Sequence, residues 1–332
     1  MPRRILGIDG GGTRTRAVIV DDTGRLLGIG LGGPANYDDI GIDATRENLS
    51  RAILAARQDA GLEAQAFDAA FFGLAGVVSE NDHRIVRQII ADLQVAQEAQ
   101  IGIDHDCRIA LAGALSGRAG IVLITGTGSA CYGRTADGKA WRAGGWGELL
   151  ADEGSGGWLG LQALRMAVRA FDGREQPTRL VDDILTHFEL QQMNDIMHRI
   201  YHVGLSRKER AALAPLVMRA ARDNDEVAQR LIDEGVAELA QCVQAVAHRL
   251  QIQDRFDLAI VGGLYSVEDV FAAPLRAAIR TKAPGCRIQP AELSPVLGAC
   301  ILALQQIQVE PATVSAALTI TETTLAGALA ER

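Results

Sequence analysis

Short apolar runs that end in polar or glycine-rich turns alternate along this chain with longer stretches of helical period. Residues 5–31 have the pattern of three strands, separated by the glycines after Ile8 and by the polar turn Asp21–Arg25. The segments that follow predict a helix, a strand, a helix, a strand and a helix, at residues 43–60, 69–74, 82–93, 101–103 and 109–115. We expect Asp43 to cap the first of these helices. This order of elements predicts an α/β domain with a mixed sheet.

The same pattern begins again at Gly120, so the chain contains an internal repeat of one strand-turn-strand unit. Before a later strand at 258–261, residues 158–250 predict helices almost throughout, as an insertion into an α/β domain would. An apolar helix is expected at 295–307, which could cross back to brace the first domain, and the residues after it are either helical or frayed. The expected organisation is an N-terminal domain, a C-terminal domain and a tail, at residues 1–115, 116–308 and 309–332, with the helical insertion at 158–250.

Capping signals divide the helical insertion into separate helices. Ser206 and Glu209 form the S-x-x-E pattern of a capping box, and Asp223 or Asp225 can cap the long helix that follows. The charged run Arg207–Arg210 lies at the start of the first capped helix, and we expect it to be a solvated face.

Composition limits the class of protein. The 332 residues are 48% hydrophobic and only 4% aromatic, so the chain can bury a large, mainly aliphatic core. A net charge of −8 argues against nucleic acid and anionic membranes as partners, because such surfaces need clustered lysine and arginine. No apolar stretch reaches the roughly 18 residues that a membrane helix requires. Five widely spaced cysteines without a C-x-x-C pair indicate reduced thiols and a cytoplasmic protein.

Three glycine turns, each at the end of a predicted strand, carry the strongest chemical signal. They are Asp9-Gly10-Gly11-Gly12-Thr13, Gly126-Thr127-Gly128-Ser129 and Gly262-Gly263. Glycine lets backbone N–H groups approach a ligand closely, and two such turns that face each other would hold a polyphosphate from both sides. The chain has neither the P-loop signature G-x-x-x-x-G-K-S/T nor a dinucleotide-binding G-x-G-x-x-G after a strand. The turns therefore predict a nucleotide held between two similar domains.

These turns, together with Gly144-Gly145-Trp146-Gly147 and Asp152-Glu153-Gly154-Ser155, resemble the N-acetylglucosamine kinase group of the BadF/BadG/BcrA/BcrD-type ATPases. That group is part of the superfamily of sugar kinases, heat-shock chaperones and actin. The resemblance covers roughly residues 4–305, and Ala151 departs from it where the group usually has glycine. It implies an α/β protein of two duplicated ribonuclease H-like (actin-like ATPase) domains around a cleft, with the helical insertion in the second. It also implies ATP and Mg²⁺ as ligands.

The resemblance assigns roles to three carboxylates. Asp106, just before the small-residue helix, would be the base that takes the proton of the acceptor hydroxyl, and Asp104 is the competing candidate. Either residue could instead only cap that helix. Asp9 would orient Mg²⁺ through water, although it could simply brace the glycine turn.

Two further sets of residues follow from the resemblance. The ATP-binding set supplies backbone and hydroxyl donors from the three turns: Gly10, Gly11, Gly12, Thr13, Gly126, Thr127, Gly128, Ser129, Gly262 and Gly263. The sugar-binding set offers planar polar groups, backbone groups and an apolar face: Asn36, Gly145, Trp146, Gly147 and Asp152. Thr13 and Ser129 could instead only cap their turns, and Gly262-Gly263 could be a plain strand-to-helix turn. Asn36 could be a turn residue, and Trp146 a hydrophobic plug between domains.

The resemblance predicts an ATP-dependent kinase that transfers the γ-phosphoryl group to the 6-hydroxyl of N-acetylglucosamine. Glucosamine and N-acetylmuramic acid are alternative acceptors, because the pockets for their substituents cannot be identified from sequence. Two other classes compete: an ATPase that activates an iron–sulfur dehydratase, and a sugar-sensing module without catalysis. The sugar-loop motif and the lack of a glycine-flanked cysteine argue against the first, and the acidic charge argues against a DNA-binding sensor. We also expect a homodimer formed through the helical insertion, on the resemblance alone.

Overall fold

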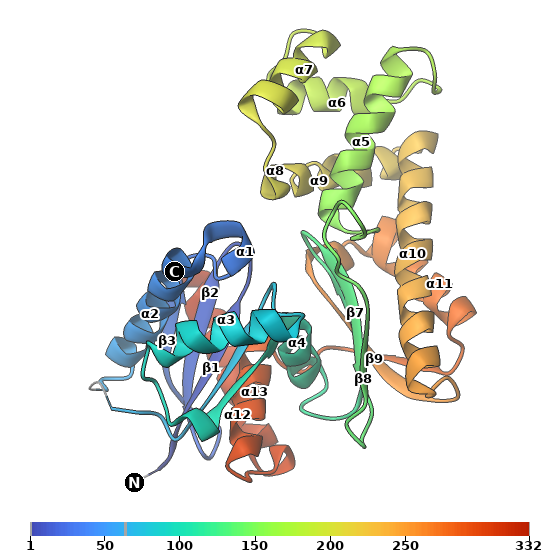
Figure 1. Cartoon of the computed structure of the whole chain (residues 1–332). Helices are drawn as coiled ribbons and strands as arrows, with labels where there is room; N and C mark the ends of the chain where they lie inside the picture. The colour runs from blue at the N-terminus through green and yellow to red at the C-terminus, as the bar shows by residue number, and fades with distance from the viewer. Residues whose placement is uncertain (1, 63–64, 332) are drawn as a thin grey trace. The chain divides into compact units, whose positions relative to one another are not determined.

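The computed structural model describes residues 2–62 and 65–331, and the chain folds into two compact units (Figure 1). Unit 1 comprises Met1–Ala119 together with Pro290–Arg332, and unit 2 comprises Gly120–Gln289. The segment after residue 289 therefore returns to unit 1, whereas the sequence pattern placed residues up to 308 in the second domain and the rest in a tail. The reason for the difference is that the last helices bury their apolar residues against the sheet of unit 1.

A mixed five-stranded sheet forms the centre of unit 1, in the order β3-β2-β1-β4-β5. Its strands are β1 (Arg4–Gly10), β2 (Thr15–Asp21), β3 (Leu26–Gly32), β4 (Ala69–Leu74) and β5 (Ile101–His105). The first three pair antiparallel, whereas β4 runs parallel to β1 and β5 runs parallel to β4. Asp9 on β1 is in register with Gly73 on β4, which is in turn in register with Asp104 on β5. The register therefore brings two of the predicted carboxylates to the same edge of the sheet.

Helices cover both faces of this sheet. They are α1 (Tyr37–Ile40), α2 (Ile42–Asp59), α3 (Glu80–Ala91), α4 (Asp106–Ala114), α12 (Pro295–Gln306) and α13 (Pro311–Glu331). Alternate residues of β2 face the two layers: Ala17 and Ile19 lie in one apolar cluster with α2 and α3, and Val18 and Val20 lie in another with α4, α12 and α13. A sheet covered on both faces needs apolar residues throughout its strands, which explains the continuous apolar runs of the sequence.

Unit 2 repeats this topology, with the strand order β10-β9-β6-β7-β8. Its strands are β6 (Gly120–Thr125), β7 (Ser129–Arg134), β8 (Ala140–Gly144), β9 (Phe256–Val261) and β10 (Cys286–Gln289). Again the first three are antiparallel, while β9 runs parallel to β6 and β10 runs parallel to β9. The predicted internal repeat is confirmed, and the structure adds β10, a strand that the sequence pattern did not indicate.

The long segment between β8 and β9 is mainly helical, as predicted. Its helices are α5 (Gly156–Phe171), α6 (Leu180–His187), α7 (Ile196–His198), α8 (Arg207–Ala211), α9 (Ala214–Arg222) and α10 (Glu226–Leu250), and α11 (Ala273–Lys282) follows β9. Short 3-10 or π-helical turns lie at η1 (Glu98–Gln100), η2 (Met193–Asp195), η3 (Arg199–Val203), η4 (Gly263–Ser266) and η5 (Glu268–Ala272). Within the described ranges, no helix combines the length and the apolar character needed to cross a lipid bilayer.

Three helix starts test the predicted caps. Gly41, with a φ of 83°, precedes α2, so Asp43 lies in the first turn of that helix and is not its cap. Asp225 caps α10, where its Oδ1 accepts a backbone N–H at 3.0 Å. The capping box of Ser206 and Glu209 is present at α8. Capping by an acidic side chain also suits the positive end of the helix dipole at α10.

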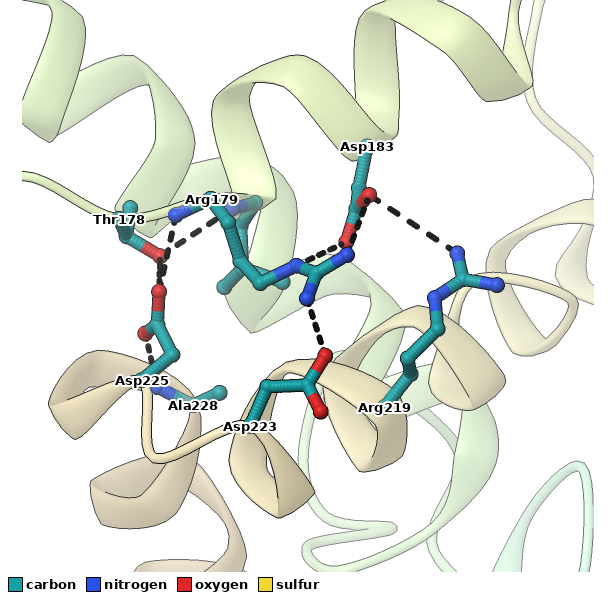
Figure 2. A network of polar contacts seen from close by, with 8 residues as sticks. Thr178, Arg179, Asp183, Arg219, Asp223, Asp225 and Ala228 are labelled. Atoms are coloured by element: carbon teal, nitrogen blue, oxygen red, sulfur yellow. Dashed lines mark hydrogen bonds and ion pairs between the residues drawn. The ribbon is translucent and has the colours of Figure 1, made fainter.

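A polar network joins the start of α6 to the turn between α9 and α10 (Figure 2). Asp225 Oδ2 accepts hydrogen bonds from the Thr178 hydroxyl and from the backbone N–H of Arg179, each at 2.8 Å. The Arg179 guanidinium pairs with Asp183 at 3.1 Å and also with Asp223. The network therefore holds the C-terminal end of α9, and other residues of α9 line the cavity described below.

Candidate functional site

The first glycine turn begins where β1 ends. A Cβ on Gly10 would lie 2.4 Å from Leu74 Cδ2, so packing alone requires glycine there. Gly11 and Gly12 differ, because the nearest atoms to an added Cβ would be 3.7 Å away and neither residue has a left-handed backbone. Thr13 is exposed at the end of the turn. Two glycines that the fold does not require are consistent with a ligand that approaches the backbone closely.

Asp9 occupies the end of β1, beside Arg16, with 3.2 Å between Oδ2 and Nη1. Burial raises the pKa of the Asp9 carboxyl, the Arg16 guanidinium lowers it, and the negative charge of Asp106 raises it again. The Arg16 Nε is itself buried and makes no hydrogen bond within the described part of the chain. Asp9 and Asp106 are thus close enough to influence each other, and a cation near them would relieve their mutual repulsion.

The two candidate bases have different surroundings. Asp104, on β5, accepts a hydrogen bond from His105 N at 2.8 Å and lies 3.9 Å from the Arg108 guanidinium. Asp106 is the first residue of α4, and its Oδ1 accepts a weak hydrogen bond from the Cys107 thiol at 3.4 Å. Neither carboxylate caps α4, because His105 Nδ1 accepts the capping hydrogen bond at 3.2 Å. Asp104 thus has a backbone donor and a guanidinium beside it, whereas Asp106 makes no ion pair with a described residue.

Asn36 lies just before α1, and only the nitrogen of its side-chain amide makes a hydrogen bond to a described residue. Its Nδ2 donates to Asp39 Oδ2 at 2.7 Å, while its Oδ1 is buried without a partner among the described residues. A Cβ on Gly76 would lie 2.3 Å from this oxygen. The Asn36 Oδ1 is therefore a buried acceptor without a partner among the described residues, whereas such groups are usually paired in folded proteins.

The second glycine turn joins β6 to β7 and supports the start of α5. Gly156 N donates to Gly126 O at 2.8 Å, and Gly157 N donates to Thr127 O at 3.0 Å. The Ser129 hydroxyl is buried and donates to Glu153 O at 2.9 Å, so it ties the turn to the following loop. This bond does not cap the glycine turn itself, and it commits the one donor of the Ser129 hydroxyl.

A cavity of about 530 Å³ within unit 2 brings the second and third turns together. It is lined by residues of both turns and of α5, α8, α9 and the η4 region: Gly126, Thr127, Gly156, Ala211, Ala214, Pro215, Met218, Arg222, Gly263, Leu264 and Val267. An added Cβ on Gly263 would meet no atom within 4 Å. Gly262 has a φ of 115° and lies against the Thr125 backbone, so its own conformation requires glycine. The cavity therefore combines predicted phosphate and adenosine contacts in one place.

The loop after β8 carries the predicted sugar contacts of unit 2. Gly145 and Gly147 have φ values of 68° and 83°, which shape the loop on each side of Trp146. The Trp146 ring is exposed, and the Arg142 guanidinium lies 5.0 Å from its centroid. An exposed ring of this kind offers an apolar face to a ligand.

Asp152 ends this loop as a buried carboxylate with a φ of 66°. Its Oδ2 lies 2.5 Å from Arg207 Nη2. Burial raises the pKa of the Asp152 carboxyl, while the Arg207 charge and a hydrogen bond from the Ser129 backbone lower it. An added Cβ on Gly128 would lie 2.8 Å from Asp152 Oδ2, so the carboxylate rests on the second glycine turn.

The predicted solvated helix start at Arg207–Arg210 is exposed at its first three residues and half-buried at Arg210, and both of its arginines make ion pairs. Arg207 pairs with Asp152, and Arg210 binds Glu148 through two nitrogens, with Nε at 3.0 Å from Oε2. Both partners lie in the loop after β8, so α8 holds that loop in place. The local sequence gives no signal for these pairs, because the partners are 55 and 62 residues away along the chain.

Comparison with known proteins agrees with this geometry. The chain is 32% identical over 300 residues to an N-acetylmuramic acid/N-acetylglucosamine kinase of Clostridium acetobutylicum. The matched residues cover 90% of this chain and 97% of the relative. The chain is 28% identical over 310 residues to an N-acetyl-D-glucosamine kinase of Dictyostelium discoideum, with coverage of 90% and 97%. A crystal structure from Chromobacterium violaceum, provisionally named N-acetylglucosamine kinase, matches with a TM-score of 0.72 and 29% identity over 92% of this chain and 99% of that chain.

The fold and the sequence thus lead to one family. The two sheets of identical strand order confirm the predicted α/β class of two duplicated ribonuclease H-like domains with a helical insertion in the second. The sequence model of the BadF/BadG/BcrA/BcrD ATPase family matches residues 6–303. The chain belongs to the BadF/BadG/BcrA/BcrD ATPase family.

Proposed function

We propose that this protein is an ATP-dependent amino-sugar kinase that transfers the γ-phosphoryl group of ATP to the 6-hydroxyl of N-acetylglucosamine. The cavity in unit 2 carries the proposal, because it unites Gly126, Thr127 and Gly263 in a volume of about 530 Å³. That volume is within the usual range for small-molecule sites. The names of the similar kinases support an amino sugar as the acceptor.

The nucleotide would be held mainly by backbone groups. The first turn, Gly10–Thr13, and the second, Gly126–Gly128, would supply N–H donors to phosphate oxygens, with the Thr13 hydroxyl as a further donor. Gly263 would let the adenosine lie against the backbone. When bound, Mg²⁺ would neutralise phosphate charge. Asp9 would orient the ion through a water molecule, because Mg²⁺ keeps most of its waters and is bound by one or two carboxylates.

The acceptor sugar would be oriented by Asn36, Asp106 and Asp152. In this proposal Asp106 accepts the proton of the 6-hydroxyl as that oxygen attacks the γ-phosphorus. The unpaired Asn36 Oδ1 accepts a hydrogen bond from a sugar hydroxyl. Trp146 provides an apolar face for the ring, and Gly145 and Gly147 provide backbone groups.

Coupled measurement of ADP release with Mg·ATP tests this function. The acceptors are N-acetylglucosamine, glucosamine, N-acetylmannosamine, N-acetylmuramic acid, glucose and no sugar. We expect N-acetylglucosamine to give the largest kcat/KM. A larger kcat/KM for N-acetylmuramic acid would replace N-acetylglucosamine as the proposed substrate. One similar kinase carries both sugars in its name. Hydrolysis of ATP independent of sugar would contradict the kinase and favour an activator ATPase.

The proposal also includes a cytoplasmic homodimer formed through the helical insertion. Light scattering coupled to size-exclusion chromatography measures the mass directly. Twice the 35.3 kDa of one chain is the expected result, and a mass of one chain would contradict the dimer.

Substituting Gly12 by alanine tests the role of the first turn. An added Cβ has room in the fold, so the melting temperature should change little. It would obstruct the approach of phosphate to the backbone, so the KM for ATP should rise about tenfold or more. The control is Gly10→Ala, which crowds Leu74 and should lower stability, since overpacking costs about 1–3 kcal/mol. An unchanged KM for ATP in a stable Gly12→Ala protein would remove this turn from the ATP site.

A further inference from the structure

We propose that Arg207, on α8, donates to the terminal phosphoryl group of ATP while it holds Asp152 in place. The inference rests on the proposed kinase function and adds a catalytic cation to it. Phosphoryl transfer needs positive charge near the transferred group, and this chain lacks the lysine of a P-loop.

The position of Arg207 is the first argument. Its Nη2 would lie 2.2 Å from an added Cβ on Gly128, and its Cζ would lie 3.3 Å from it. The guanidinium therefore lies directly against the second glycine turn, whose Gly126 and Thr127 line the cavity. Ala211, at the other end of the same short helix, lines the cavity.

The second argument is the number of donors that Arg207 has left. A guanidinium carries five N–H donors in a fixed plane. Within the described residues, Arg207 uses one nitrogen, Nη2, on Asp152, and its side chain is 45% exposed against 3% for Asp152. The other nitrogens of Arg207 therefore have no partner among the described residues, and its side chain is open to a ligand.

Two neighbouring arginines are already committed. Arg210 is bound by Glu148 and by the Leu205 carbonyl, and its side chain is only 18% exposed. Arg222 lines the cavity but is bound by both oxygens of Asp269, at 2.5 and 2.8 Å. Of these three arginines, Arg207 is the one that can bind a carboxylate through one nitrogen and a phosphate through another.

The pairing with Asp152 has a further consequence. Asp152 is buried, and a buried carboxylate is costly unless it is paired. A single guanidinium would thus contact both the carboxylate proposed to bind the sugar and the turn proposed to bind ATP. Loss of Arg207 should affect phosphoryl transfer more strongly than it affects binding of the adenosine part of the nucleotide.

Three variants test the proposal: Arg207→Gln, Arg207→Lys and the neighbouring control Lys208→Gln, at an exposed residue. The measurements are kcat at saturating sugar and the Kd values of a non-hydrolysable ATP analogue and of ADP by calorimetry. For Arg207→Gln we expect kcat to fall about 100-fold or more. Its affinity for the ATP analogue should fall about tenfold, because one charge-assisted hydrogen bond is lost, while its affinity for ADP stays nearly constant. Arg207→Lys should restore part of kcat, and Lys208→Gln should behave as wild type.

Two outcomes would overturn the role of Arg207. One is a kcat for Arg207→Gln within twofold of wild type, and the other is equal weakening of the ATP analogue and ADP, which a purely structural residue would cause. If Arg207→Gln does not fold, the double variant Asp152→Asn/Arg207→Gln removes the unpaired buried charge and permits the same nucleotide comparison. A wild-type protein without sugar-dependent turnover would contradict the proposed function instead. The ratio of the Kd for the ATP analogue to the Kd for ADP, compared between wild type and Arg207→Gln, would still test the role of Arg207.

Discussion

Replacing Asp106 by asparagine should lower kcat by about 10²- to 10⁴-fold, which is the usual contribution of a general base. Asparagine keeps the size of the side chain but cannot accept the proton of the attacking hydroxyl. Asp106 lies at the start of α4, and His105, not Asp106, caps this helix, so the fold should tolerate the change. The Kd of the sugar, measured by calorimetry in the absence of ATP, should change little.

Asp104→Asn is the matched control, two residues away on β5. Its carboxylate already engages His105 N and the Arg108 guanidinium, so it should contribute mainly to local structure. We expect a kcat within a few-fold of wild type. If Asp104→Asn abolished turnover and Asp106→Asn did not, the base would have to be reassigned to Asp104.

Replacing Asp152 by asparagine should raise the KM for the sugar by about 10- to 100-fold, because hydrogen bonds to a charged group contribute about 1.5–3 kcal/mol. Asparagine suits this test better than alanine for two reasons. It tolerates the left-handed backbone at a φ of 66°, and it leaves a partner for Arg207. The KM for ATP should rise less than the KM for the sugar.

Glu153→Gln controls for a change of charge in the same loop. Glu153 contributes a backbone oxygen to Ser129, which the substitution retains, so its KM values should stay close to wild type. A sugar KM for Asp152→Asn equal to that of wild type would remove Asp152 from the sugar site. Thermal melting of both variants checks that the loop remains folded.

Local patterns predicted the parts of this fold that depend on neighbouring residues. The three-strand units and the glycine turns follow from short apolar runs bounded by polar or glycine-rich turns, and the repeat indicated that both units share one topology. The capping box at Ser206 was also recognisable, because its two members are three residues apart. The same signals placed Gly126, Thr127 and Gly263 at the ends of strands, and the structure brings them to one cavity.

Long-range contacts explain what the sequence could not show. The helix at 295–307 could be expected to brace the first domain, whereas the tail after it had no expected place. Its helix α13 joins unit 1 because Val314, Leu318 and Leu325 are buried in an apolar cluster of that unit. The partner of Arg207 could not be predicted, because nothing near this residue in the sequence indicates a buried carboxylate 55 residues earlier. Ser129 matched a phosphate-binding pattern, yet its hydroxyl donates to Glu153 O, which only the folded loop brings within reach.

Phosphorus NMR of the product most directly tests the account that this protein phosphorylates an amino sugar at its 6-hydroxyl. The protein is incubated with Mg·ATP and N-acetylglucosamine, and the phosphorus–proton couplings identify the esterified carbon. The account predicts a phosphomonoester coupled to the two protons on carbon 6, formed in equal amount with ADP. A phosphate on carbon 1, or inorganic phosphate as the sole product beside ADP, would contradict it.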